Sequence, residues 1–190
     1  MFMGSIHLEI YVGIPGSGKT TIAAHIAKKA IKLGIPVYSN VPIKGTYNLN
    51  PKIDLGRYLI EDCVVLIDEA GLEHSNRNFK SFSEFNKQFY KLHRHYKAKV
   101  FVFSQADDMD LIIRNIAFKF WLVKQSLIPY LTVAKPTRRY IGIDDMTHEL
   151  KSMMEFKSFL FTKRYINPLV WKMFNTYEAP RLEDKVWIKW

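Results

Sequence analysis

Short apolar segments bounded by turn residues alternate with helical patterns in the first part of the chain. Residues 6–12 are apolar and β-branched, which predicts a strand. From Lys19 to Leu33, apolar side chains recur on one helical face, and Gly34 and Pro36 then provide a stop signal. The segment 44–60 shows no period and is predicted to be a loop with one short helix.

Further strands and a second helix follow the same logic. Continuous apolar runs predict strands at Val37–Val41, Val64–Ile67 and Val100–Phe103. A helix is predicted at Ser81–Tyr96. Aromatic residues at helical spacing are expected to carry it into the core: Phe82, Phe85, Phe89 and Tyr96.

The second half predicts a hairpin and a less regular end. Phe118–Lys124 and Leu131–Ile143 are interpreted as strands joined by a turn at Ile128-Pro129. From about Thr147 the pattern is interpreted as helical and irregular. The alternation of strands and helices predicts an α/β fold with a mainly parallel sheet flanked by helices. We expect residues 1–145 to form the core and residues 146–190 a small β/α extension packed on it, within a single domain.

Charge and cysteine content narrow the setting. The chain of 190 residues has 28 basic and 18 acidic residues, a net charge of +10. This excess favours nucleic acid, an acidic membrane surface or a nucleotide as partner, although a basic protein without such a partner has the same composition. The lone Cys63 excludes an intrachain disulfide and suits a reducing cytosol. No apolar run approaches the roughly 20 residues of a membrane-spanning helix.

The segment Gly13–Thr20 matches the phosphate-loop pattern G-x-x-x-x-G-K-[ST] between a predicted strand and a predicted helix. Its glycines let backbone N–H groups point inward at phosphate oxygens, and the helix start adds partial positive charge. Lys19 is expected to reach the outer phosphates, and the Thr20 hydroxyl to ligate Mg²⁺. The predicted nucleotide-binding residues are Gly13, Pro15, Gly16, Ser17, Gly18, Lys19, Thr20 and Thr21.

Two carboxylates end the apolar run Val64–Ile67. In a chain with a phosphate loop, Asp68 is expected to hold Mg²⁺, and Glu69 to orient and deprotonate the attacking water. This pair favours hydrolysis over a small-molecule kinase, whose acceptor is not water.

Three further residues are candidates for the catalytic set. Gln105 follows the strand at Val100–Phe103 and is interpreted as a sensor of the terminal phosphate, with a polar strand cap as the alternative. Arg94 and Arg114 are candidates for a finger that neutralises charge in the transition state.

These motifs together resemble the zonula occludens toxin (Zot-like) ATPases, which include the filamentous-phage assembly ATPases. The resemblance covers roughly residues 6–125. Besides the phosphate loop, it rests on these segments: Val37-Tyr38-Ser39-Asn40-Val41-Pro42, Leu66-Ile67-Asp68-Glu69-Ala70, His93-Arg94-His95, Phe103-Ser104-Gln105 and Met109-Asp110-Leu111-Ile112-Ile113-Arg114. It implies a RecA-like P-loop NTPase core that works as a ring. It also implies a role in phage assembly and export through the host inner membrane.

The sequence therefore predicts a motor ATPase that hydrolyses ATP with Mg²⁺ to drive particle assembly, export or DNA translocation. Expected partners are further copies in a ring, and single-stranded DNA or a phage nucleoprotein. Many Zot-like relatives carry a membrane span and a periplasmic tail, and this sequence shows neither. We therefore expect a cytoplasmic protein of the host cell, reaching the inner membrane through a partner. A nucleotide or small-molecule kinase, and a nucleotide-gated binding module, are the alternatives.

Overall fold

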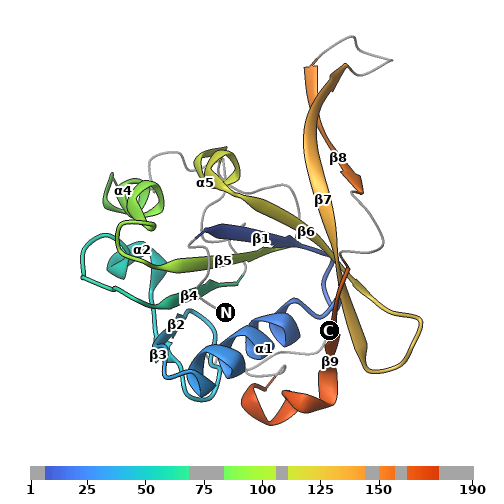
Figure 1. The fold of residues 1–190 in the computed structure, drawn as a ribbon, viewed down its shortest axis with the longest axis horizontal. Helices are drawn as coiled ribbons and strands as arrows, with labels where there is room; N and C mark the ends of the chain where they lie inside the picture. Colours follow the sequence, from blue (N-terminus) through green and yellow to red (C-terminus); the bar gives the residue numbers. More distant parts are fainter. Residues whose placement is uncertain (1–6, 69–83, 106–110, 144–149, 157–161, 176–190) are drawn as a thin grey trace, which may run out of the picture.

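A single mixed β-sheet organises the computed structural model, which describes residues 7–68, 84–105, 111–143, 150–156 and 162–175 (Figure 1). The nine strands follow the order β3-β2-β4-β5-β1-β6-β7-β8, and β9 also pairs with β7. Their bounds are β1 Leu8–Val12, β2 Val37–Ser39, β3 Tyr47–Asn48, β4 Val64–Ile67, β5 Lys99–Ser104, β6 Lys119–Gln125, β7 Leu131–Ile143, β8 Leu150–Phe156 and β9 Lys163–Ile166.

The first six strands are parallel to one another, and the last three are antiparallel additions at one side. β5 lies between β1 and β4, the strand order of RecA-like P-loop NTPases. The predicted α/β class with a mainly parallel sheet is therefore confirmed. Because parallel strands end at the same edge, the loops after β1, β4 and β5 are brought together there.

Helices cover both faces of the sheet (Figure 1). The described helices are α1 Lys19–Lys32, α2 Pro51–Asp54, α4 Glu84–Leu92 and α5 Leu111–Ile116, with 3₁₀ turns η3 Asn167–Leu169 and η4 Trp171–Met173. β1 supplies both cores: Leu8 and Ile10 belong to the cluster that includes residues of α4 and α5, and Tyr11 to the cluster of α1. None of the described helices is long and apolar enough to cross a lipid bilayer.

The helix α1 ends within one residue of the prediction. Its four alanines and Ile22 are fully buried, whereas Ile31 near its end is exposed. Gly34 follows the helix with φ of +72°, a conformation that favours glycine, and its N–H donates to the carbonyl oxygen of Ile31 at 2.9 Å. The end of α1 is therefore set by a local feature, the glycine, that can be recognised in the sequence.

The helix α4 ends at Leu92, four residues before the predicted end, and buries only part of the predicted face: Phe89 is 2% exposed and Tyr96 packs against the core. Phe85 is 53% exposed, so its predicted place in the core is wrong. The buried positions are Asn86, Phe89, Tyr90 and, just after the helix, His93. Their spacing of three and four residues makes them neighbours on one stripe of the helix. Phe82 lies outside the described residues.

The predicted helical end is also wrong, because the chain returns to the sheet twice. β7 pairs with β6 along Thr132–Thr137, and its other edge accepts β9 at Leu131–Ala134 and β8 at Thr137–Ile143. A strand of 13 residues offers backbone donors and acceptors that these later segments satisfy. These strand pairings outweigh the weak helical preference of the local sequence.

A buried carboxylate links the central strand to this late segment. Glu9 is 3% exposed, and its side chain accepts from Trp121 Nε1 at 2.7 Å, Tyr11 OH at 3.0 Å and Lys163 Nζ at 3.1 Å. His7 Nε2 lies 2.7 Å from the second carboxylate oxygen. Burial alone would raise the pKa of Glu9, but the bond to His7 and the charge and bond of Lys163 outweigh it, so the pKa lies well below its usual range. The ionised carboxylate thus joins β1, β6 and β9.

We expect Glu9→Gln to lower the free energy of unfolding by about 3 kcal/mol at pH 7, because an amide cannot accept from all of these donors. The pKa of Glu9 is lower in the folded state than its unfolded value of 4.5. The ionised carboxylate therefore stabilises the fold in full above pH 4.5, and this contribution is lost progressively as the pH falls below 4.5 towards the folded-state pKa. The free energies of unfolding of the wild type and Glu9→Gln, measured by urea denaturation, should therefore approach each other as the pH falls below about 4.5. Glu61→Gln, at an exposed position, is the matched control. A difference that stays constant from pH 7 to pH 3 would contradict the account.

Candidate active site

The phosphate loop connects β1 to α1 in the predicted context of strand, loop and helix. Gly13 N–H donates to the carbonyl oxygen of Ser104 at 3.1 Å, which fixes the loop to the end of β5, and Ser17 N–H donates to that of Ile14 at 3.1 Å. Gly16 and Gly18 have φ of +73° and +96°, values that glycine adopts without strain. Gly18 caps α1 without a side-chain bond, so the helix start keeps its capacity to receive an anion.

Lys19 is held inside the loop. Its side chain is only 8% exposed, and Nζ donates to the carbonyl oxygens of Gly13 at 2.7 Å and Ile14 at 3.1 Å. These bonds hold the ammonium group against the backbone of the loop. The position suits a residue that neutralises the outer phosphates of a nucleotide.

Thr20 and Asp68, the two residues predicted to hold Mg²⁺, are in direct contact. The Thr20 hydroxyl donates to Asp68 Oδ2 at 3.0 Å, and Asp68 is 5% exposed at the end of β4. Mg²⁺ is held in nucleotide sites by one or two protein oxygens together with phosphates and water. These two hard oxygens fit that donor set. Among the described residues, no group of three or more His, Cys, Asp or Glu side chains is placed to hold a metal ion.

Asn40 positions Asp68, a role that the sequence did not assign. Asn40 Nδ2 donates to the carbonyl oxygen of Asp68 at 2.9 Å, and Asp68 N–H donates to Asn40 Oδ1 at 2.8 Å. Asn40 follows β2, the neighbour of β4 in the sheet. The amide therefore fixes the backbone from which the Asp68 carboxylate projects. The only sequence signal was the Asn at the end of the second strand within the family resemblance.

A cavity of about 280 Å³ opens over the loop. Six of the predicted nucleotide-binding residues line it: Pro15, Gly16, Gly18, Lys19, Thr20 and Thr21. Asp68 and Gln105, which follow β4 and β5, bound it on one side of β1. Gln125 and Thr132, from the end of β6 and the start of β7, bound it on the other side. The cavity therefore has a carboxylate side and an amide and hydroxyl side.

The C-terminal segment completes the second side. Thr132 is fully buried, and its hydroxyl donates to Asn167 Oδ1 at 2.9 Å. A Cβ on Gly18 would lie 2.4 Å from Thr132 Oγ1, so β7 packs directly on the loop. Sequence reasoning missed Gln125, Thr132 and Asn167. No local signal marks them, because their meeting depends on the pairing of β7 with β9.

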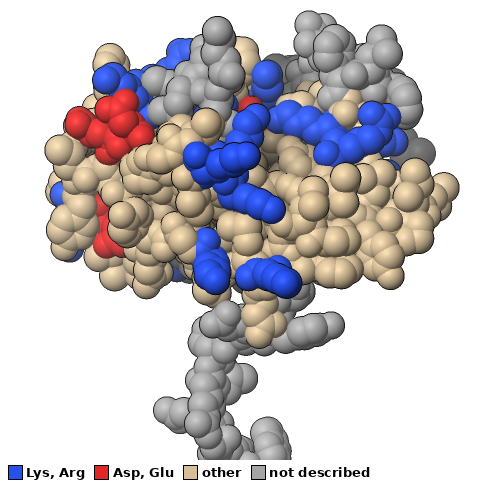
Figure 2. Space-filling model, turned by 60° about the horizontal axis from the view of Figure 1, so that its bottom comes forward, with Lys and Arg blue, Asp and Glu red and all other residues tan. Residues whose placement is uncertain are grey.

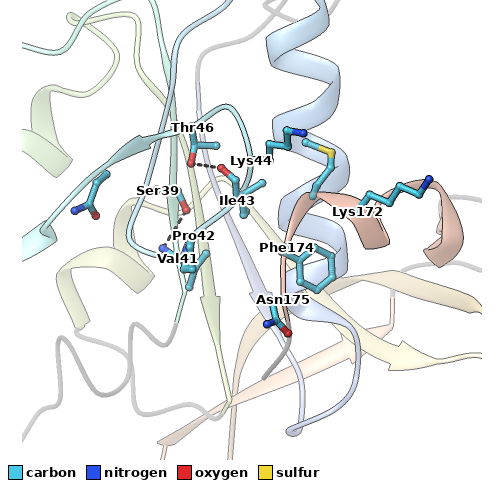
Figure 3. Close-up of a pocket in the computed structure, with 11 residues that line it drawn as sticks. Ser39, Val41, Pro42, Ile43, Lys44, Thr46, Lys172, Phe174 and Asn175 are labelled. Atoms are coloured by element: carbon cyan, nitrogen blue, oxygen red, sulfur yellow. Dashed lines mark hydrogen bonds between the residues drawn. The ribbon is translucent and has the colours of Figure 1, made fainter. Parts of the chain in front are cut away.

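A larger cavity of about 660 Å³ lies beside the first, between the β2–β3 loop and residues 172–175 (Figure 3). Phe174 borders both cavities. Lys44 N–H donates to the carbonyl oxygen of Met173 at 2.6 Å, and the Thr46 hydroxyl to that of Ile43 at 2.8 Å. This cavity contains neither the phosphate loop nor a carboxylate among its described lining residues. The chemistry therefore belongs to the smaller cavity.

The remaining predicted residues are not placed in the cavity. Arg94 is exposed in the turn before β5, at the edge of the sheet opposite the phosphate loop. Arg114 lies in α5, and only its backbone is described. Glu69 lies outside the described residues. Gly13 and Ser17 shape the loop without lining the cavity.

The comparisons with known proteins identify the fold. No family model and no curated protein matches the sequence. The structure is similar to the N-terminal domain of zonular occludens toxin from Neisseria meningitidis, with a TM-score of 0.60 and 17% identity over 90% of this chain and 99% of that one.

Two further structures give weaker matches. The genome packaging NTPase B204 from Sulfolobus turreted icosahedral virus 2, in complex with ATP-gammaS, has a TM-score of 0.48 and 14% identity over 77% of this chain and 96% of that one. The flagellar accessory protein FlaH from Methanocaldococcus jannaschii has a TM-score of 0.47 and 14% identity over 82% of this chain and 93% of that one. The match to the toxin domain confirms the fold that the sequence resemblance predicted: a RecA-like P-loop NTPase core.

Two glycine substitutions test the packing of the loop. Gly16→Ala should cost about 1 kcal/mol of unfolding free energy, because a Cβ there meets nothing within 4 Å and only the positive φ is strained. Gly18→Ala should cost about 3 kcal/mol, because the same strain is joined by a clash with Thr132. Urea denaturation of both variants measures the difference. Equal losses would show that Thr132 does not press on the loop.

Proposed function

We propose that the chain binds ATP with Mg²⁺ in the cavity over the phosphate loop and hydrolyses it. The observation that carries this proposal is the bond between Thr20 and Asp68 beside the buried Lys19. A phosphate-loop hydroxyl and a strand-end carboxylate in contact are the protein half of a magnesium–triphosphate site. The RecA-like fold supports the same assignment.

Each residue has a defined task in the proposed reaction. The loop N–H groups and Lys19 bind the β- and γ-phosphates, while Thr20 and Asp68 hold the metal. Bound Mg²⁺ supplies charge neutralisation to the phosphate oxygens as the terminal bond breaks. Glu69 orients a water and accepts its proton, and Gln105 contacts the terminal phosphate from the end of β5.

The different residues on the two sides of the cavity suggest how the nucleotide is oriented in it. Asp68 and Gln105 mark the side of the reacting phosphate. The nucleoside then extends to the opposite side of β1, where Thr132 and Asn167 lie. Because the Thr132 hydroxyl occupies Asn167 Oδ1, the Asn167 amide keeps N–H donors for a ribose or base. We propose that this side recognises the nucleoside.

The biological role that we propose is a motor for phage or mobile-element particle assembly, export or DNA translocation. The similarity in fold to a zonular occludens toxin domain and the net charge of +10 support this role. Residues 1–145 would form the motor core, with 146–190 packed on it. The chain would work as a homo-oligomeric ring on single-stranded DNA or a nucleoprotein, in the host cytoplasm. A partner would bring it to the inner membrane.

Glu69→Gln should retain ATP binding and lower turnover by about 10²–10⁴-fold, because the isosteric amide cannot accept the proton. Phosphate release and ATP binding are measured on the same preparation. Exposed Glu61→Gln is the control and should leave both unchanged. Near-normal turnover in Glu69→Gln would remove Glu69 from the mechanism and favour a kinase.

Asn167→Ala should weaken ATP binding about tenfold and leave the binding of inorganic triphosphate unchanged, because only the nucleoside contacts are lost. Calorimetric titration with both ligands measures the two affinities. Asn48→Ala, at an exposed amide on β3, is the matched control. Equal loss for both ligands would show that Asn167 supports the loop and does not read the nucleoside.

An arginine from a neighbouring copy is expected to complete the site, and Arg114 is preferred over Arg94. Mixing inactive Glu69→Gln with inactive Arg114→Ala should restore part of the activity, since mixed rings contain some intact sites. A finger contributes about 10³–10⁵-fold, so even partial recovery is measurable in a phosphate-release assay. If co-assembled mixtures stay inactive, Arg114 does not act in trans, and Arg94 is tested in the same way.

A further inference from the structure

Large apolar side chains are exposed together where the β6–β7 hairpin meets the C-terminal 3₁₀ turns. Those in the hairpin turn are 63% to 104% exposed, and those from the end of β9 to η4 are 51% to 56% exposed. These six residues, called the apolar tip below, are Leu127, Ile128, Tyr130, Ile166, Leu169 and Trp171. Single exposed apolar side chains are common on soluble proteins, whereas a group of this kind indicates a surface with a partner.

The two parts of the apolar tip form one surface. The rings of Tyr130 and Trp171 meet edge to face, with centroids 5.5 Å apart. Asn167 N–H donates to the carbonyl oxygen of Tyr130 at 2.9 Å. Leu131 at the start of β7 also pairs with Ile166 at the end of β9. The hairpin turn and the C-terminal turns are therefore fixed to each other.

The hairpin turn is closed by its own hydrogen bonds. Ser126 N–H donates to the carbonyl oxygen of Leu131 at 3.0 Å, and Ile128 N–H donates to Ser126 Oγ at 3.1 Å. The side chains of Leu127 and Ile128 thus project from a formed turn. A partner that covers them does not have to order the chain first, which lowers the entropic cost of binding.

The segments that carry the apolar tip contain no acidic residue. Residues 117–137 and 162–175 include Lys and Arg but neither Asp nor Glu. Figure 2 views the molecule from the side of α1 and the C-terminal turns, with the β6–β7 hairpin of Figure 1 towards the right. Lys and Arg gather across the middle, Asp and Glu lie mainly at the left, and much of the right-hand part is uncharged. A basic surface therefore borders an apolar one.

Three lysines lie next to the apolar tip. Lys28 of α1 donates to the carbonyl oxygen of Leu169 at 2.8 Å, and this neutral acceptor does not cancel its charge. Lys124 near the end of β6 and Lys172 in η4 are exposed. Among the described residues, none of these three lysines forms an ion pair. The rim of the tip is therefore positively charged.

A lipid bilayer with anionic headgroups matches this combination. Leu and Ile side chains can enter the acyl boundary, Trp and Tyr favour the level of the headgroups, and lysines are attracted to anionic lipid. Single-stranded nucleic acid matches it less well, because bases stack on aromatic rings and not on Leu127 or Ile128. A second copy that used the same face would bring like charges together.

We propose that the apolar tip docks on an anionic lipid surface. Leu127 and Ile128 enter the layer below the headgroups. Tyr130 and Trp171 lie at the level of the headgroups, and the three lysines pair with lipid phosphates. The chain itself makes this contact, so the inference goes beyond the recruitment by a partner proposed above. It does not depend on ATP hydrolysis.

The first arm of the test is sedimentation with lipid vesicles, without nucleotide. The wild type should bind vesicles of phosphatidylglycerol and phosphatidylcholine, and bind phosphatidylcholine alone much less. Leu127→Ser should lower the partition coefficient about tenfold, because a large apolar side chain no longer leaves water. Leu59→Ser, at a position 75% exposed between α2 and β4, is the matched control and should change it less than about twofold.

The second arm tests the charge at the rim. Lys172→Gln should weaken binding to the phosphatidylglycerol vesicles about fivefold, because one lysine near an anionic surface is lost. Lys91→Gln, at an exposed position in α4, is the matched control and should weaken it less than about twofold. Added salt should weaken binding of the wild type.

The third arm tests the other occupants, with oligothymidylate titration and sedimentation velocity in the absence of vesicles. Leu127→Ser should leave oligonucleotide binding and oligomeric state unchanged. A change in the first would assign the apolar tip to nucleic acid, and a change in the second to a contact between copies; either result overturns the proposal. It is also overturned if the wild type binds both kinds of vesicle alike, or if Leu127→Ser and Leu59→Ser bind them equally.

Discussion

The contact between Glu9 and Lys163 determines how β9 meets the central strand β1. A carboxylate buried in the central strand is stable only with donors around it, and Lys163 supplies one of them from β9. The same strand leads into Asn167, which lines the cavity over the phosphate loop, and on to Phe174 at its border. His25 and Lys28 of α1 add bonds to the carbonyl oxygens of Ile166 and Leu169. The C-terminal segment is therefore part of the proposed site.

The parallel order of the central strands places the chemistry. β1, β4 and β5 end at one edge, so the phosphate loop, Asp68 and Gln105 meet without long connecting segments. Asn40 at the end of β2 then fixes the Asp68 backbone through two hydrogen bonds. The rigid sheet holds these groups in position before a ligand arrives, which is what electrostatic stabilisation of a transition state requires.

Local signals predicted the elements that local chemistry decides. Gly34 ends α1, the apolar run Val64–Ile67 is β4, and the hairpin strand Leu131–Ile143 has the predicted bounds. The phosphate loop was recognisable because phosphate binding requires glycines, a lysine and a threonine at fixed spacing along the chain. Phe85 was misplaced, because helical spacing does not reveal which stripe faces the sheet.

What the sequence did not reveal depends on contacts between distant segments. β8 and β9 form only because β7 offers an edge, and no period in residues 150–166 indicates it. Thr132 and Asn167 are 35 residues apart and polar, so nothing local marks them as partners. In the sequence, Glu9 is a single polar position in a predicted strand. Its hydrogen-bond donors come from β1, β6 and β9, so their meeting is not visible in the local sequence.

The central claim is that the loop around Lys19 binds a nucleoside triphosphate. Calorimetric titration of ATP into the wild type and into Lys19→Ala, with Mg²⁺ and with EDTA, measures it directly, and circular dichroism verifies that the variant is folded. The account predicts Mg²⁺-dependent binding to the wild type and none to folded Lys19→Ala. Unchanged ATP affinity in folded Lys19→Ala would contradict it.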